Sequence, residues 1–432
     1  MKSWSAPQVP SLPRLAESLE LFDTPHSTTL PTHSRQGAAS LYVCGITPYD
    51  ATHLGHANTY VQFDLLVRYW LACGVQVNYV QNVTDIDDPL LERAEATGAD
   101  WRELAEEQTE LFRQDMAALS VIPPNSYLGA VEMIPAIVED VERLAELGIA
   151  YRVPAEDADG DDYYFDIAEA ESRTDWRLGS VGGYDRPTMD SLFGERGGDP
   201  QRPGKRDRLD PLLWRARREG EPEWDGGALG RGRPGWHIEC SVIARRHLPA
   251  PFTVQGGGSD LRFPHHEFSA AHATAADGVA LAERYMHTGM VGLDGEKMSK
   301  SKGNLVLVSQ LRARGEDPQA VRTLLLSHHW RTDWSYTDAD LALASGRLQR
   351  WKQALQRAPE QNPGESAEEP DELQYALMSI LALDLNAPAA LDQLDMWAEG
   401  HLAAQTSRAR VRDVVLALLG IDLADGSPSS TD

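Results

Sequence analysis

The sequence predicts an α/β fold: a Rossmann-like, doubly wound parallel sheet with an inserted segment and a C-terminal helical bundle. Short apolar segments with strand-like alternation are repeatedly followed by segments with helical spacing, which is typical of β-α-β units. Beyond about Tyr336 the strand signals end and leucines recur at helical spacing, which favours a bundle. Apolar residues make up 42% of the 432 residues, enough to form the cores of several domains.

The chain divides into five expected segments. Residues 1–38 are rich in Pro, Ser and Thr, so we expect an N-terminal extension that wraps the surface rather than forming core. The other four segments are the first half of the Rossmann-like domain at 39–125, an inserted connective segment at 126–234, the second half with the sequence KMSKS at 235–336, and the helical bundle at 337–432.

The first half begins with the sequence SLYVCG, in which Leu41 and Val43 alternate as in a strand that Gly45 ends. Apolar residues at helical spacing follow up to Gly74 and predict a helix. The sequence VQVNYVQNV, which begins at Val75, is β-branched and alternating, so it predicts a second strand. Strand, helix and strand form a β-α-β unit, so we expect a parallel sheet of the nucleotide-binding type.

The inserted segment has its own pattern. Helices are expected around residues 101–119 and 131–147, and residues 151–165 predict a hairpin with Asp159-Gly160 as its turn. Residues 172–234 are dense in Gly, Arg, Asp and Pro and contain the sequence ERGGDP at 195–200. Alternation of strand and helix then resumes in the sequences GWHIECSVIA, FTVQGGGSD, FPHHE and RYMHTGMVGL, which we assign to the second half of the sheet.

Charge and cysteine content exclude several classes of protein. Acidic residues outnumber basic residues by 66 to 40, so the chain repels polyanions and general nucleic-acid binding is disfavoured. The three cysteines, Cys44, Cys73 and Cys240, are too few and too scattered for a disulfide framework. No apolar stretch is long enough to span a membrane, so we expect a cytoplasmic protein without a membrane partner.

The sequence HLGH, His53 to His56, lies between the first strand and its helix. Free backbone N–H groups at a helix N-terminus favour phosphate, and Gly55 lets a nucleotide approach the backbone closely. The imidazoles of His53 and His56 are suited to donating hydrogen bonds to phosphate oxygens. By itself, however, a pair of histidines in a loop is more often incidental.

The sequence DGEKMSKSKGN is flanked by glycines and is typical of a mobile loop. Its lysines, Lys297, Lys300 and Lys302, form a basic cluster in an acidic protein. Such a cluster suits a pyrophosphate leaving group, whose charge grows in the transition state. The alternative is a solvated basic loop, but HLGH and KMSKS in this order are more specific than either motif alone.

Together these motifs resemble those of the class I aminoacyl-tRNA synthetases. The sequences YVCGITPYDATHLGH, NVTDIDD, GWHIECS, GGGSDLRFPHHE and KMSKSKGN, within residues 41–304, resemble the cysteinyl branch. Within that branch, ERGGDP, GITPYD and the short C-terminal region resemble the cysteine ligases of mycothiol biosynthesis. The resemblance implies an ATP-dependent ligase that activates L-cysteine and transfers it to the amine of glucosaminyl-inositol, with His53, His56, Lys297 and Lys300 as catalytic residues.

The resemblance also implies a metal site. Cys44, Cys240 and His265 are too far apart in sequence for a local zinc signature, and without the family two buried cysteines and an unrelated histidine are the simpler interpretation. In the family these positions hold Zn²⁺. Where the tRNA-charging enzymes have a fourth ligand, a Glu, this chain has Ser269, which implies a zinc ion with one open position for the thiolate of the substrate. Cys73 is expected to be a core residue.

Further residues are expected to line the cysteinyl-adenylate pocket by their match to the family. These residues are Cys44, Gly45, Ile46, Thr47, Thr59, Asn82, Val83, Thr84, Trp236, Gly258, Ser259, Asp260 and Val291. Thr59 and Thr84 are equally compatible with helix capping or local backbone bonding, and Trp236 with a core position. Asp85, Asp87 and Asp88 either form polar scaffolding, which we favour, or bind the ammonium group of the amino sugar.

The acceptor distinguishes two possible enzymes. RNA binding requires a basic track, but residues 341–432 contain 7 basic and 14 acidic residues. The sequence therefore favours a small cationic acceptor and no tRNA, although a basic stretch at Arg215, Arg217, Arg218, Arg231 and Arg233 weakens the contrast. The alternatives are a cysteinyl-tRNA synthetase and a non-catalytic zinc- or nucleotide-binding homologue. We expect a monomer that uses Mg²⁺ with ATP and one Zn²⁺ ion.

Overall fold

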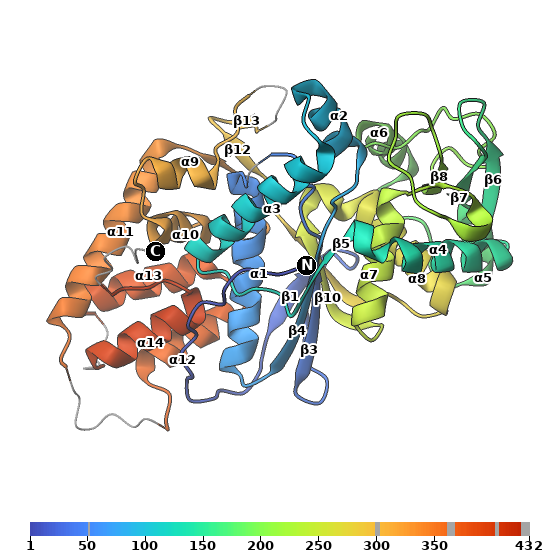
Figure 1. Cartoon of the computed structure of the whole chain (residues 1–432). Coiled ribbons are helices and arrows are strands. Elements are labelled where there is room, and N and C mark those ends of the chain that lie inside the picture. Colours follow the sequence, from blue (N-terminus) through green and yellow to red (C-terminus); the bar gives the residue numbers. More distant parts are fainter. Residues whose placement is uncertain (51, 299–302, 361–367, 402–405, 425–432) are drawn as a thin grey trace.

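The fold is organised around one parallel sheet. The computed structural model describes residues 1–50, 52–298, 303–360, 368–401 and 406–424. The sheet has the strand order β11-β10-β3-β4-β5, and every neighbouring pair is parallel (Figure 1). Its strands are β3 (Ala38–Val43), β4 (Gln76–Val83), β5 (Ser126–Gly129), β10 (Phe252–Gly258) and β11 (Ala282–Thr288). The predicted fold class is therefore confirmed.

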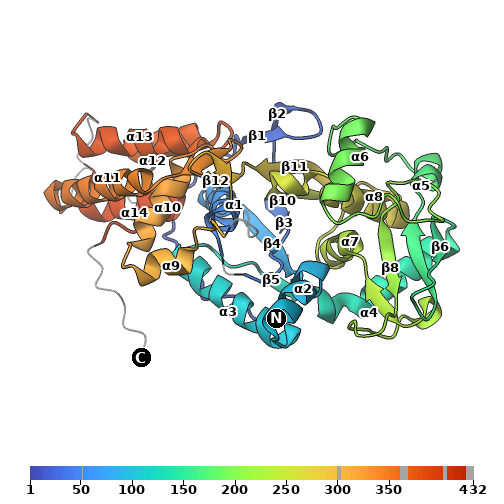
Figure 2. The same cartoon turned by 90° about the horizontal axis from the view of Figure 1, so that it is seen from above.

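The strand order changes direction between β3 and β10. The chain builds β3, β4 and β5 outward on one side of this point and β10 and β11 on the other. Open α/β sheets bind ligands beyond the carboxyl ends of the strands at such a switch point. Helix α1 (Leu54–Ala72) covers one face, while α7 (Trp236–His247) and α8 (His265–Asp277) cover the other (Figure 2).

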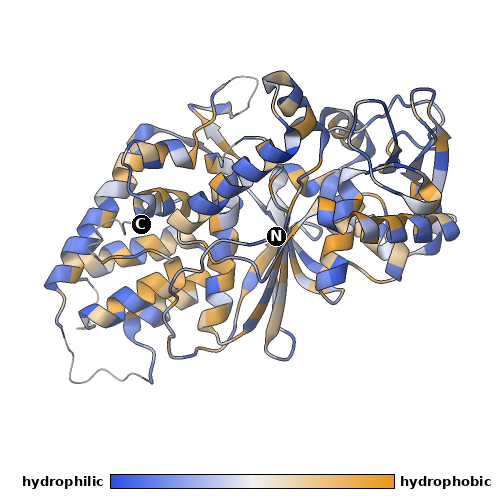
Figure 3. Ribbon diagram, viewed as in Figure 1, coloured by the Kyte–Doolittle hydropathy of each residue, from blue (hydrophilic) through white to orange (hydrophobic). Residues whose placement is uncertain are grey.

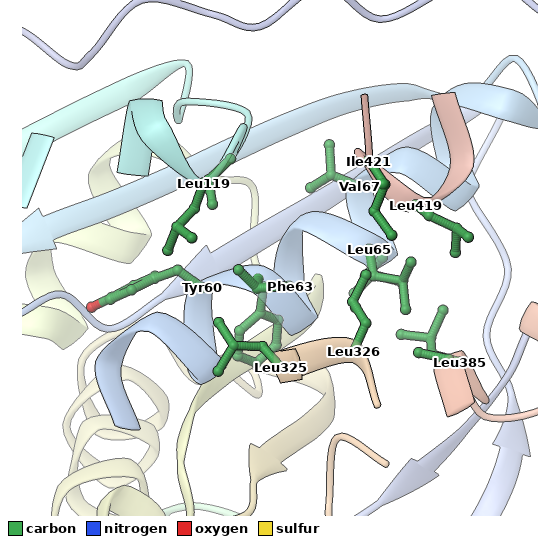
Figure 4. Packing of buried hydrophobic residues seen from close by; sticks show 14 of the residues in the cluster. Tyr60, Phe63, Leu65, Val67, Leu119, Leu325, Leu326, Leu385, Leu419 and Ile421 are labelled. Carbon is green, nitrogen blue, oxygen red and sulfur yellow. The ribbon is translucent and has the colours of Figure 1, made fainter. Parts of the chain in front are cut away.

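Helix α1 is buried on nearly all sides, because it lies between the sheet and the C-terminal helices. Its Tyr60, Phe63, Leu65 and Val67 belong to one apolar cluster with residues of the bundle (Figure 4). The residues labelled there include Leu385, Leu419 and Ile421 of the bundle, and Leu325 and Leu326 of a helix that precedes it. The sheet and the bundle therefore share a continuous core.

A buried ion cluster reinforces this contact. Asp64 of α1 accepts a 2.7 Å hydrogen bond from Arg68 Nε and another from Arg322, and all three side chains are fully buried. Arg68 and Arg322 also donate to the carbonyl oxygens of Leu416 and Leu419, each at 2.7 Å. Burial alone would raise the pKa of Asp64, but the two arginines hold it below its ordinary value.

The helices beyond residue 336 are those predicted from the leucine spacing. Two further helices and a small sheet precede them. The helices are α9 (Val308–Ala313), α10 (Pro318–Leu326), α11 (Asp338–Arg357), α12 (Glu372–Leu381), α13 (Ala387–Ala398) and α14 (Arg408–Leu419). The small sheet contains β12 (Val291–Leu293), β13 (Glu296–Lys297) and β14 (Trp334–Tyr336).

The inserted segment forms a separate antiparallel sheet with its own apolar cluster. The predicted hairpin is present as the pair β6 (Ala150–Pro154) and β7 (Asp161–Phe165), and the sheet continues with β8 (Leu212–Ala216) and β9 (Gly232–Pro234). Its helices are α4 (Ala130–Glu146), α5 (Ile167–Arg173), α6 (Arg186–Glu195) and the 3₁₀ turn η1 (Gly227–Leu229). Strand β5 belongs to the central sheet although it follows residue 125, where we expected this segment to begin. The five-segment division itself stays a prediction.

The N-terminal extension contributes to the core, contrary to the expectation that it only wraps the surface. It forms the hairpin of β1 (Glu20–Asp23) and β2 (Thr28–Pro31), and Leu19 and Leu21 are fully buried. Trp4 Nε1 donates a 2.7 Å hydrogen bond to the carbonyl of Val121. Each apolar stretch is too short to show periodicity, so composition alone was misleading.

Three elements remain: α2 (Asp88–Thr97), α3 (Trp101–Ala118) and the 3₁₀ turn η2 (Ser259–Arg262). Hydrophobic residues line the strands of the central sheet and recur along the helices that pack around it (Figure 3). Among the described residues, no helix combines the length and apolar character that crossing a bilayer requires.

Candidate active site

Three residues that are distant in sequence converge at the switch point. Cys44 directly follows β3, Cys240 lies on α7, and His265 is the first residue of α8. One ligand atom from each lies within 4.8 Å of the other two, and all three residues are buried. Two sulfur atoms and one imidazole nitrogen are a donor set typical of zinc.

The environment of His265 tests whether these residues fit a metal. Its Nδ1 lies 3.1 Å from Nδ1 of His237, and Trp236 stacks on its ring with centroids 4.3 Å apart. Its Nε2 is buried and has no hydrogen-bond partner among the described residues. A buried nitrogen is costly when unpaired, and metal-bound histidines usually have their second nitrogen hydrogen-bonded. The arrangement therefore fits a metal ligand.

The two thiols differ in their electrostatics. Burial raises the pKa of Cys44 well above its ordinary value. Burial would also raise the pKa of Cys240, but a hydrogen bond from the Cys44 thiol and the nearby imidazole of His265 hold it well below its ordinary value. The pair therefore favours one thiol and one thiolate, and a thiolate is the form that binds a cation.

Ser269 does not point its hydroxyl at the other three residues as a free donor. Its Oγ lies 2.7 Å from the carbonyl oxygen of His265 and 3.1 Å from that of His237, so the hydroxyl donates to the backbone. This bond links α8 to α7. The side chain that replaces the expected glutamate is thus used in the helix packing.

The HLGH motif forms the start of α1. His53 caps the helix, because its Nδ1 accepts a 3.1 Å hydrogen bond from the N–H of Gly55. The rings of His53 and His56 stack with centroids 3.8 Å apart. Burial lowers the pKa of His53 to about 4 and that of His56 well below its ordinary value. Both imidazoles are therefore neutral at pH 7, and the bond from Gly55 leaves the proton of His53 on Nε2.

The segment that follows the KMSKS sequence runs beside HLGH. The N–H of Leu54 donates to the carbonyl of Val306, and the N–H of Val308 donates to that of Thr52, both at 2.9 Å. Lys297 lies in β13, opposite Gly292 of β12. Lys300 and Lys302 lie outside the described residues. The structure thus brings residues next to HLGH into contact with the segment that follows KMSKS.

Asn82 connects the ends of β3 and β4. Its Oδ1 accepts from the N–H of Gly45 at 2.8 Å and from the hydroxyl of Tyr42 at 3.1 Å, while its Nδ2 donates to Thr84 Oγ1 at 3.2 Å. The N–H of Thr84 donates to the carbonyl of Ile46 at 2.9 Å. A Cβ atom at Gly45 would lie only 1.6 Å from the Asn82 carbonyl oxygen, so glycine is required there.

Thr59 links α1 to β11. Its Oγ1 lies 2.9 Å from Thr288 Oγ1 and 3.2 Å from the carbonyl of Gly55, so it makes both a tertiary and a local bond. Thr288 is also 3.4 Å from the carbonyl of Gly257.

Other expected pocket residues lie at element ends. Val83 and Gly258 end β4 and β10, Ser259 and Asp260 begin η2, and Val291 begins β12. Thr47 lies in the loop after β3, with its carbonyl accepting from Tyr49 at 3.0 Å. Cys73, at the end of α1, is half-buried against the main core.

Sequence reasoning missed a chain of buried histidines behind Cys44. His266 Nε2 lies 3.2 Å from Cys44 Sγ, and its Nδ1 lies 2.8 Å from His287 Nε2. His287 Nδ1 in turn lies 2.7 Å from Thr24 Oγ1 in the N-terminal hairpin. The two adjacent histidines of FPHHE could have indicated this chain of histidines. Nothing in the sequence indicates that Thr24 lies beside His287.

The acidic residues after β4 act on the backbone. Asp85 Oδ1 accepts from the N–H of Val131 and Asp87 Oδ1 from that of Asp88, both at 2.9 Å. Burial raises the pKa of each to about 6. Nearby Glu239 is buried, and burial raises its pKa well above its ordinary value. These contacts support the scaffolding interpretation.

The five arginines of the basic stretch are all paired with carboxylates. Arg215 contacts Glu221 at 2.8 Å, Arg218 contacts Asp162 at 2.9 Å, and Arg217 contacts Asp159. Arg231 contacts Glu223 at 2.9 Å, and Arg233 contacts Glu221 at 3.1 Å. Their charge is consequently balanced locally rather than presented as a basic track.

Comparisons with known proteins identify the family and the fold. The family described as tRNA synthetases class I (C) catalytic domain matches residues 31–346. A protein of Micrococcus luteus named L-cysteine:1D-myo-inositol 2-amino-2-deoxy-alpha-D-glucopyranoside ligase is 60% identical, with 98% of this chain and 100% of that protein covered. A protein of the same name from Paenarthrobacter aurescens is 56% identical over 98% of this chain and 100% of its own length. Methionyl-tRNA synthetase of Mycobacterium tuberculosis bound by methionyl-adenylate shares the fold, with a TM-score of 0.59 at 17% identity over 89% of this chain and 92% of that chain.

Proposed function

We propose, from the premise that this chain belongs to the family of class I (C) tRNA synthetase catalytic domains, that it is an ATP-dependent ligase joining L-cysteine to the amine of glucosaminyl-inositol. The observation that carries this proposal is the 60% identity, over 98% of this chain and all of the relative, to a ligase of that name. The reaction would yield the amide of cysteine with the glucosamine nitrogen, together with AMP and diphosphate.

In the first step the carboxylate of cysteine attacks the α-phosphorus of Mg-ATP, and pyrophosphate leaves. The proton on His53 Nε2, at the N-terminus of α1, is the donor that we assign to the phosphate oxygens. Lys297 and Lys300 are assigned to the leaving pyrophosphate by their match to the family. The hydrogen bonds that join Gly45, Asn82 and Thr84 fix the ends of β3 and β4, which supports an adenylate held against these ends.

Selection of cysteine is assigned to Cys44, Cys240 and His265. These residues would hold a zinc ion, which supplies a Lewis-acidic position for the substrate sulfur. The unpartnered Nε2 of His265 and the hydroxyl of Ser269, which is committed to backbone carbonyls, support three protein ligands and an open position. A thiol, with a free pKa of about 8.5, loses its proton to a metal far more readily than the hydroxyl of serine.

In the second step the amine attacks the adenylate carbonyl, and AMP leaves. The paired arginines and the acidic tail favour a small cationic acceptor over tRNA. A cysteinyl-tRNA synthetase remains the alternative enzyme, and a non-catalytic homologue would have no use for leaving-group lysines.

The decisive experiment measures cysteine-dependent ATP–pyrophosphate exchange and then offers glucosaminyl-inositol or tRNA to the enzyme, with zinc quantified. We expect one zinc per chain, and AMP release only with the amino sugar. Cys240→Ala and His265→Ala should lose both zinc and exchange, while Cys73→Ala keeps both. Discharge by tRNA alone, or full activity without bound metal, would contradict the proposal.

We propose two further properties, the cellular compartment and the oligomeric state. The three free cysteines support a reducing, cytoplasmic compartment. A monomer is proposed because the chain's own elements suffice to build the site.

A further inference from the structure

The sequence ERGGDP ends α6 and has no part in the chemistry described so far. Arg196 is the C-terminal cap of α6, and Gly197 follows with a φ of +85°. A Cβ atom at Gly198 would lie 2.6 Å from the carbonyl oxygen of Phe193, to which the N–H of Gly198 donates. The two glycines thus turn the chain sharply directly after the arginine.

Arg196 reaches out of the inserted segment to η2. Its Nη1 donates hydrogen bonds to the carbonyl oxygens of both Asp260 and Phe263. The turn η2 connects the end of β10 to the start of α8, so these carbonyls lie between Gly258 and His265. A cation is favoured beside carbonyls at the C-terminal end of a helical turn.

Further contacts join this part of the inserted segment to α8 and η2. Phe193 of α6 packs edge-on against Phe268 of α8, with ring centroids 6.0 Å apart. Arg262 of η2 donates to the carbonyl of Gly182 and lies over the ring of Tyr184 at 4.5 Å.

Glu267 of α8 also contacts this part of the inserted segment. It accepts hydrogen bonds from the N–H groups of Val181 at 3.0 Å and Gly182 at 2.7 Å. The inserted segment therefore makes hydrogen bonds with both η2 and the start of α8.

We propose that Arg196 is a positioning residue that fixes the turn Ser259–Asp260 in the conformation that receives the nucleotide. The inference rests on the proposed function, in which this turn faces the adenylate. Arg196 touches no substrate in this proposal; it acts through the two carbonyl groups. Through Arg196, the inserted segment thereby helps to form the ATP site at the edge of the sheet.

The test compares Arg196→Ala with Arg196→Lys, whose single ammonium group replaces the single nitrogen that bonds both carbonyls. Arg186→Ala is the matched control, because Arg186 lies on the same helix, is itself exposed, and pairs with Asp190 and Asp207. We measure the Kd of ATP by equilibrium titration without cysteine, the KM values of ATP and cysteine in pyrophosphate exchange, bound zinc, and the Tm.

We expect Arg196→Ala to weaken ATP binding about tenfold, as the loss of charged hydrogen bonds allows. In Arg196→Ala, the KM of cysteine and the zinc content should equal those of the wild type. Arg186→Ala should equal the wild type in ATP affinity, and Arg196→Lys should recover most of that affinity. Unchanged ATP affinity in Arg196→Ala would overturn the proposal, as would equal losses for ATP, cysteine and zinc. If the wild type shows no cysteine-dependent exchange, the proposed function fails, whereas the effect on ATP affinity still decides the role of Arg196.

Discussion

His265 shows how single residues prepare this site. One ring nitrogen meets His237, the ring face meets Trp236, and the other nitrogen is left without a partner among the described residues. Such preorganisation reduces the motion that must be frozen when a ligand binds. Gly45 contributes in another way, because only the absence of a side chain lets β3 approach Asn82.

A buried carboxyl near HLGH makes stability depend on pH. Asp115 of α3 is fully buried and accepts a 2.7 Å hydrogen bond from Arg312, yet burial raises its pKa from 3.8 to about 6. A folded-state pKa above the unfolded value means that this contribution to stability is complete below pH 3.8 and is lost as the pH rises through about 6.

We therefore predict that Asp115→Asn, which stays uncharged, becomes more stable relative to the wild type as the pH rises. Between pH 4 and pH 7 the difference in free energy of unfolding should change by roughly 2–3 kcal/mol in favour of the variant. Denaturant unfolding at both pH values measures this difference. Glu110→Gln, on the exposed side of the same helix, serves as the control. A difference that does not change with pH would show that Asp115 is already ionised at pH 4.

At the scale of elements, α1 depends on the helices that surround it. Arg322 of α10 joins Asp64 of α1 to the end of α14, with every partner buried. Removing one member of a buried ion cluster leaves uncompensated charge and unsatisfied carbonyl groups. Surface ion pairs lack this cost because water replaces the partner.

We predict that Arg322→Met lowers the free energy of unfolding by about 3 kcal/mol. Arg350→Met, which removes an exposed pairing with Asp395, should cost less than about 1 kcal/mol. Denaturant unfolding of both variants, compared at one pH, checks this prediction. Similar losses in the two variants would mean that the buried cluster has no special weight.

Elements with long patterns were predictable, and short ones were not. The strand ending at Val43, the helix that ends before Gly74 and the hairpin around Gly160 follow from alternation, spacing and turn chemistry. Strand β5 has four residues after a proline pair, and β1 also has four, so neither shows a period. At the site, the convergence of Cys44 with Cys240 was expected only through the family, because no local spacing connects them. The contact of Arg196 with η2 depends on tertiary packing that periodicity does not encode.

At the scale of the whole molecule, the bundle completes the core of the sheet domain. The main apolar cluster extends from Leu41 of the sheet through α1 to Leu423 near the end of the described chain. Without the bundle, α1 would expose a large apolar face, and such faces promote aggregation.

A fragment of residues 1–336 is therefore predicted not to fold cooperatively. Circular dichroism during thermal unfolding and size-exclusion chromatography should show an aggregated or partly folded chain. A fragment of residues 1–424 keeps every residue of the cluster and should unfold like the full protein. If the shorter fragment melted cooperatively as a monomer, the two parts would be independent.

The burial of α1 also limits how this scaffold can be re-engineered. HLGH forms the N-terminus of the helix that the bundle encloses, so whatever replaces the bundle also sets the tilt of HLGH. If the C-terminal region were exchanged for an RNA-binding module, that module would have to pack against α1 as the bundle does. Only then could the hybrid protein use a new acceptor. Change of acceptor by simple domain exchange is thus disfavoured, and remodelling within the intact scaffold is the more accessible route.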